Sequence, residues 1–185
     1  MNFKILTYEF EGSHYSISPL SGNLLVSKTK TYESNLNQQI SNAIWLNDNP
    51  YQLTSLSSFF YNTNSETNMQ KLKAYNNKLM LLGNKRFFLS CIYSRLRIPI
   101  FENTIEAFDY IAQIEIHREK KGKICLQRAL LAAKTSKTFK KNGVLFIGAQ
   151  LPTGIMHAWI IENGVQPDRQ DREWIMYKPL LAITF

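Results

Sequence analysis

The chain has 185 residues, of which 44% are hydrophobic and 12% aromatic, so it can bury one ordinary core or two small ones and is not a disordered chain. Its formal net charge is +8, from 22 Lys and Arg against 14 Asp and Glu. This excess favours an acidic peptide, a nucleic acid or an anionic membrane face as a partner, and a solvated basic surface explains it equally well. Because no RNP-type motif, zinc finger or basic zipper accompanies the charge, specific nucleic-acid recognition is not expected.

Cysteine usage and hydropathy narrow the class of protein further. Cys91 and Cys125 are too few for a disulfide framework, and the histidines are scattered without the spacing of a zinc site. The first residues lack the apolar run of a signal peptide, and no segment approaches the roughly eighteen apolar residues of a membrane-spanning helix. We therefore expect a cytoplasmic protein with reduced thiols, no membrane segment and no metal.

Residues 1–98 are predicted to form a small module in which strands precede helices, an order that fits a winged-helix-like fold. In chain order, the predicted elements are strands at 3–10, 14–18 and 23–28, helices at 36–45 and 53–61, a polar loop at 62–68, and apolar segments between 71 and 93 that form one buried helix or two short ones. The proline-containing break at residues 97–99 places a domain boundary near residue 98.

Residues 99–185 are predicted to contain helices followed by antiparallel strands, which is an α+β order. In chain order, these elements are a helix over 104–120 capped by Thr104, a helix over 125–134, a buried strand at 144–149 and an alternating strand at 156–161. Asn163-Gly164 is a strong two-residue hairpin signal, so we expect a further strand to return after it.

Three side chains of this second segment have the types and the order of a papain-like or transglutaminase-like cysteine site. Cys125 begins a helix, where the partial positive charge of the helix N-terminus stabilises the reactive thiolate. His157, on a strand, would stabilise that thiolate as an imidazolium and then donate its proton to a leaving amine. A carboxylate must hold the imidazole, and Asp168 can reach back to it from the strand after the hairpin, with Asp171 as the rival for this role.

Each of these residues also has an ordinary structural interpretation. A lone cysteine beside apolar residues is usually a small core residue, as we expect for Cys91, and a lone histidine is usually a polar surface residue. Trp159 faces the same side of its strand as His157 and is either core or a wall of the site. The backbone N–H of Cys125 is one expected oxyanion donor, and the second is open because Gln127 lies too close in sequence to be a clear choice.

Three short stretches of this segment are distinctive: Cys125-Leu-Gln-Arg-Ala-Leu130, Val144-Leu-Phe-Ile-Gly148 and His157-Ala-Trp-Ile160. Together they resemble the lasso-peptide maturation proteases, relatives of the microcin processing protein within the transglutaminase-like superfamily. The resemblance covers about residues 120–170 and implies a papain/transglutaminase-like domain over 99–185, in which the helix with the catalytic cysteine packs on an antiparallel sheet. Carried over by position, it makes Cys125 the nucleophile, His157 the general base and acid, and Asp168 the orienting carboxylate.

The same resemblance implies a function: a cysteine protease that cleaves the leader peptide from a lasso precursor peptide. A partner cyclase similar to asparagine synthetase then closes the isopeptide ring. Any ATP requirement is expected in that cyclase, because this chain has no Gly-x-x-x-x-Gly-Lys-Ser/Thr loop, and no cofactor of its own is expected.

The resemblance also implies a role for residues 1–98. Fused members carry a winged-helix-type module that binds the leader as an added strand, and residues 15–22 are similar to its hairpin region. The match departs at Ile160-Ile161, where several members have an acidic or small residue, and at Pro167-Asp168, where the spacing from His157 differs. Two alternatives stay open: a transglutaminase or acyltransferase acting on a peptide, and a non-catalytic peptide-binding module.

Overall fold

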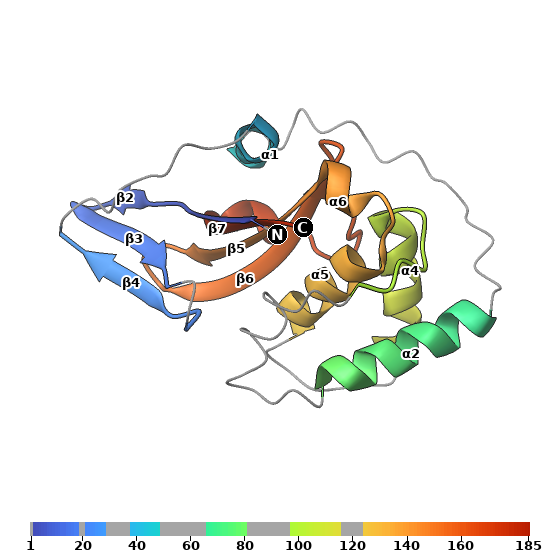
Figure 1. The fold of residues 1–185 in the computed structure, drawn as a ribbon. Coiled ribbons are helices and arrows are strands. Elements are labelled where there is room, and N and C mark those ends of the chain that lie inside the picture. The colour runs from blue at the N-terminus through green and yellow to red at the C-terminus, as the bar shows by residue number, and fades with distance from the viewer. Residues whose placement is uncertain (1, 19–20, 29–37, 49–65, 81–96, 116–123) are drawn as a thin grey trace.

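The computed structural model describes residues 2–18, 21–28, 38–48, 66–80, 97–115 and 124–185. These residues form a mixed α and β fold with two antiparallel sheets and five α-helices (Figure 1), which confirms the predicted α+β class. None of the described helices combines the length and the apolar character needed to cross a membrane. The predicted helix at 53–61, the apolar segment with Cys91 and the predicted helical residues 116–120 lie outside the described residues.

The larger sheet has four strands. They are β1 (Asn2–Ile5), β5 (Gly143–Gln150), β6 (Ile155–Glu162) and β7 (Lys178–Thr184), in the order β1-β7-β5-β6 with every neighbour antiparallel. The strands predicted at 144–149 and 156–161 are confirmed as β5 and β6. Nearly every residue of β5 is buried, because side chains pack on both faces of this strand, and this explains its unbroken apolar sequence. β6 lies at one edge of the sheet.

The first strand of the chain pairs with the last. The alternating segment predicted as one strand at 3–10 is interrupted at Leu6 and Thr7, and its first part, β1, pairs with β7 from Asn2 opposite Thr184 to Ile5 opposite Leu181. The larger sheet therefore contains residues from both sides of the predicted boundary near residue 98. Alternation along a sequence indicates a strand but does not indicate its partner, so this pairing could not be predicted.

The smaller sheet has three strands, in the order β2-β3-β4. They are β2 (Tyr8–Phe10), β3 (Ser13–Ile17) and β4 (Leu24–Ser27), which confirms the strands predicted at 14–18 and 23–28. Glu11 and Gly12 make the turn between β2 and β3 with φ of 50° and 71°, a backbone conformation that glycine adopts readily. Ile17 is fully buried in the core cluster that also contains helices of the C-terminal segment.

Helices α1 (Gln38–Asp48) and α2 (Glu66–Met80) follow the small sheet, as the predicted order requires. Ile40 and Ala43 of α1 are buried in one core cluster with Phe146 and Trp159 of the larger sheet. Leu72 and Tyr75 of α2 belong instead to the cluster on the opposite face of that sheet, and α2 contacts α4. A winged-helix arrangement of residues 1–98 stays a prediction.

Helices α4 (Thr104–Glu115), α5 (Ile124–Thr135) and α6 (Phe139–Asn142) complete the fold (Figure 1). Three buried alanines of α5, Ala129, Ala132 and Ala133, are small enough for the helix to lie close against its neighbours. The predicted cap of α4 is wrong by one residue. Asn103 caps this helix, because its Oδ1 accepts from the N–H of Glu106, whereas Thr104 donates its N–H and hydroxyl to the buried carboxylate of Glu162.

Candidate active site

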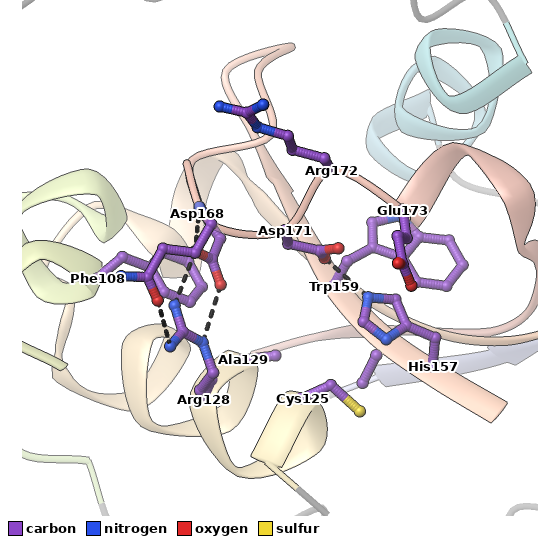
Figure 2. Close-up of a pocket in the computed structure, with 12 residues that line it drawn as sticks. Phe108, Cys125, Arg128, Ala129, His157, Trp159, Asp168, Asp171, Arg172 and Glu173 are labelled. Carbon is purple, nitrogen blue, oxygen red and sulfur yellow. Dashed lines mark hydrogen bonds and ion pairs between the residues drawn. The ribbon is translucent and has the colours of Figure 1, made fainter. Parts of the chain in front are cut away.

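A cavity of about 460 Å³ lies beside the first turn of α5 and the middle of β6 (Figure 2). Cys125, Arg128, His157, Trp159, Asp168 and Asp171 are among the residues that line it. Two of the three residues predicted for catalysis, Cys125 and His157, interact here, and the third predicted residue lines another part of the same cavity. Side chains from both faces of the larger sheet therefore contribute to one site.

Cys125 is the second residue of α5, as the amphipathic pattern predicts. Its backbone N–H is one of the first four of the helix, which have no partner within the helix, so the helix dipole favours a negative charge here. Burial raises the pKa of the thiol, but the hydrogen bond and charge of His157, together with the backbone N–H groups of Ala158 and Leu126, lower it more. The pKa of Cys125 consequently lies below its ordinary value, which favours the nucleophilic thiolate.

His157 approaches Cys125 around the edge of the sheet. On β6, His157 and Trp159 point to the face covered by α1, whereas Ala158 points to the face that packs against α5. Side chains from the two faces can meet because β6 is an edge strand, with no further strand beside it. At this edge the backbone N–H of Ala158 interacts with the sulfur of Cys125. An interior strand would separate the thiol from the imidazole.

Aromatic rings hold the imidazole in place. The ring of His157 stacks on Tyr177, with centroids 4.7 Å apart, and on Trp159, with centroids 6.0 Å apart. Trp159 is both core and wall, because its side chain is almost wholly buried and also lines the cavity. These contacts restrict the ring to the orientation in which Nε2 contacts Asp171.

Asp171, not Asp168, is the carboxylate next to His157. Its Oδ2 lies 2.8 Å from Nε2 of His157, and the two side chains are 12% and 16% exposed. Because Nε2 faces Asp171, the other ring nitrogen, Nδ1, is the one available to Cys125. Burial lowers the pKa of His157, whereas its hydrogen bonds to Asp171 and Cys125 and their negative charges raise that pKa to about 9. Each group therefore favours the charged form of the other.

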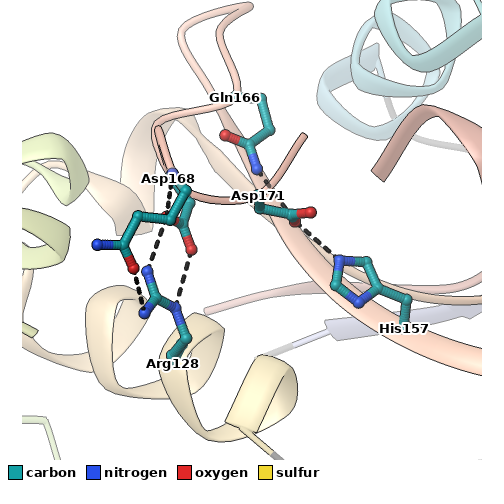
Figure 3. A network of polar contacts seen from close by, with 6 residues as sticks. Arg128, His157, Gln166, Asp168 and Asp171 are labelled. Atoms are coloured by element: carbon teal, nitrogen blue, oxygen red, sulfur yellow. Dashed lines mark hydrogen bonds and ion pairs between the residues drawn. The ribbon is translucent and has the colours of Figure 1, made fainter. Parts of the chain in front are cut away.

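Asp168 has a different partner, which corrects the expectation that it orients the imidazole. Its Oδ2 accepts from Nε of Arg128 at 3.0 Å and its Oδ1 accepts from Nη2 at 2.8 Å (Figure 3). The expected hairpin also forms only in part. Asn163 and Gly164 make the turn with positive φ, but the returning chain makes a single bridge, Glu162 to Val165, and then continues as a loop. Asp168 therefore lies on a loop and not on a strand, and its carboxylate forms an ion pair with Arg128.

Several residues of the site were not predicted. Gln166 donates from Nε2 to Oδ2 of Asp171 at 3.2 Å, and Gln170 accepts from Nη1 of Arg128 at 3.0 Å. Arg128 alone carried a signal, because it stands three residues after Cys125 and so shares a helix face with it. Gln127 donates instead to Asn76 of α2, so its side chain is engaged away from the expected oxyanion position.

The described residues contain no group of three or more His, Cys, Asp and Glu side chains placed to hold a metal ion. Comparisons with known proteins add no assignment: no family model, no curated protein and no solved structure matches this chain.

Proposed function

We propose that this chain is a cysteine peptidase of papain/transglutaminase-like architecture that removes the leader from a lasso precursor peptide. The observation that supports the chemistry best is the contact of His157 with Asp171 beside a thiol of lowered pKa, at the wall of a 460 Å³ cavity. A buried structural cysteine would have its pKa raised by burial and would have no imidazolium next to it. The resemblance of the three stretches described above supports the substrate class.

In the proposed reaction, the thiolate of Cys125 attacks the carbonyl carbon of the peptide bond that joins leader and core. The carbonyl oxygen becomes an oxyanion, which the backbone N–H of Cys125 would stabilise. His157 then gives its proton to the nitrogen of the core peptide, the C–N bond breaks, and the leader remains on sulfur as a thioester. Neutral His157 next removes a proton from water, and the hydroxide attacks the carbonyl carbon of the thioester. The C–S bond then breaks, the leader leaves with a free carboxylate, and Cys125 is again a thiolate beside the imidazolium.

Asp171 takes the part expected of Asp168. Its carboxylate accepts a hydrogen bond from Nε2–H of His157. This contact keeps Nδ1 directed to the sulfur and stabilises the imidazolium that is present before acylation and forms again during hydrolysis of the thioester. The core peptide would leave with a free amino terminus, which a partner cyclase in the cytoplasm could join to a side-chain carboxylate. In this proposal any ATP is consumed by the cyclase.

The test uses the full chain and the short peptides encoded beside its gene. Mass spectrometry of each incubated peptide should find leader and core fragments with the wild-type protein, and Cys125→Ala should abolish them while circular dichroism stays unchanged. Cleavage that persists in purified Cys125→Ala would refute the assignment.

The same experiment separates the two alternatives. Products that carry an added amine in place of the new carboxylate would identify an acyltransferase. No cleavage, together with alkylation of Cys125 no faster than that of a free thiol, would identify a binding module.

A further inference from the structure

The buried ion pair of Arg128 and Asp168 is a polar feature of the described residues that the proposed chemistry does not use. Both side chains are almost completely buried, with 10% and 9% exposed. Burying a charged pair costs desolvation free energy that the attraction between the charges often only balances, so such a pair is a poor device for stability alone. Two parallel N–H···O bonds, however, fix the relative position of the two groups tightly.

The loop that carries Asp168 also carries Asp171, and the two are connected by short contacts. The backbone N–H of Asp171 donates to the carbonyl of Asp168 at 3.1 Å, and the N–H of Gln170 donates to Oδ1 of Asp168, also at 3.1 Å. Arg128 adds its own bond to the side chain of Gln170. The position of Asp168 therefore determines where Asp171 lies, three residues later.

The loop passes around the edge of the sheet between these two contacts. Asp168 meets α5, which packs on one face, whereas Trp174 and Tyr177, which follow Asp171, are buried in the cluster on the opposite face. Figures 2 and 3 show the two carboxylates directed to different partners, Asp168 to Arg128 and Asp171 to His157. The edge of β6 thus has an acid on each side of it.

Helix α5 carries both the thiol of Cys125 and the guanidinium that holds the loop. Arg128 follows Cys125 by three residues, a rise of about 4.5 Å along α5. The ring of Phe108 from α4 lies against the guanidinium, with its centroid 5.8 Å from Cζ, and restricts its movement. A displacement of α5 would move the sulfur and the loop anchor together.

We propose that Arg128 is a positioning residue, which holds the loop through Asp168 and Gln170 so that Asp171 stays in hydrogen-bond contact with His157. Arg128 acts on the site through the loop and takes no part in bond making. The inference rests on the proposed function for the reason why Asp171 must be held in place. The positioning itself can be measured without any substrate.

The decisive variant is Arg128→Lys, because it keeps the charge and loses the two-pronged contact. The titration of the His157 imidazole is followed by NMR in the full-length protein, with a His157→Gln spectrum to assign its signal among the three histidines. We expect Arg128→Lys to lower the pKa of His157 from about 9 by about one pH unit or more. Arg172→Lys is the matched control. This arginine is exposed and lines the same cavity, but the loop is held to α5 through Asp168 and Gln170 and not through Arg172.

Two further variants distinguish positioning from simple electrostatics. Arg128→Met removes a nearby positive charge, which by Coulomb's law alone would raise the pKa of His157, whereas loss of positioning lowers it. Asp171→Asn should lower the pKa of His157 at least as far, and adding Arg128→Lys to it should lower it no further, because the two residues act through one contact.

A wild-type titration of His157 in Arg128→Lys, or a rise in Arg128→Met, would overturn the inference. Each result can be told apart from a failure of the proposed function. A protein that cleaves no peptide can still show the expected titrations, and a protein that cleaves its precursor can still fail to show them.

Discussion

Replacing Asp171 by Asn should slow the reaction of Cys125 with an alkylating reagent near neutral pH, where Cys125 and His157 share one proton. The rise of the His157 pKa from 6.5 to about 9 corresponds to about 3 kcal/mol of interaction with Asp171 and Cys125 beyond the cost of burial, at about 1.4 kcal/mol per pH unit. If Asp171 supplies about half of this, the ratio of the thiolate–imidazolium form to the neutral thiol–imidazole form falls about tenfold in the variant. Asn can still form a hydrogen bond, but it carries no charge to stabilise the imidazolium.

The assay measures iodoacetamide modification between about pH 5 and 9. Peptide mass spectrometry separates Cys125 from Cys91. Glu173→Gln is the matched control, because Glu173 is an exposed carboxylate that lines the same cavity, and its loss should leave the profile almost unchanged. Equal rates in Asp171→Asn and the wild type, or equal slowing in Glu173→Gln, would refute the reasoning.

Two further predictions concern stability. Above about pH 6.5 the two groups act in opposite directions on the free energy of unfolding of the wild type. The raised pKa of His157 gives stability that is lost as pH rises, the lowered pKa of Cys125 gives stability that is lost as pH falls, and the two contributions partly cancel. In Cys125→Ala only the contribution of His157 remains, so the free energy of unfolding measured in urea should decrease as pH rises above about 6.5. Parallel pH profiles for the variant and the wild type would contradict this. Gly148→Ala should destabilise the fold by about 1–3 kcal/mol or more, because the new Cβ would lie 2.2 Å from the carbonyl oxygen of Lys178 and 2.7 Å from Trp159. An unchanged melting temperature would contradict this close approach.

The elements nearest the site were predictable because their signals are local. The unbroken apolar run of β5, the alternation of β6 and the amphipathic pattern of α5 depend on neighbours in sequence. Cys125 and His157 were identified because a thiol at a helix start and an imidazole on a strand each have a local reason to react. Gly148, part of one of the stretches that carry the family resemblance, has its physical reason in the close approach of β7 at the register shift between Ile147 and Gly148.

The remainder depends on contacts between distant segments. The choice between Asp168 and Asp171 is decided by Arg128, which lies about forty residues earlier and captures the first of the two acids. The hairpin signal at Asn163-Gly164 correctly predicts a turn, but it cannot say that the returning chain will cross the sheet edge as a loop. The pairing of β1 with β7 also joins distant segments, and the alternating sequence of β1 does not indicate which strand it pairs with.

The pairing of β1 with β7 bears on how this protein can be dissected. A fragment that starts at residue 99 would leave the β7 residues Leu181, Ala182 and Ile183 with an uncovered row of backbone donors and acceptors, which invites self-association. Studies that examine residues 1–98 and 99–185 separately should therefore supply β1 in trans or tether it to the C-terminus. Because Asn2 lies opposite Thr184, a short linker would suffice for a circularly permuted version that begins elsewhere.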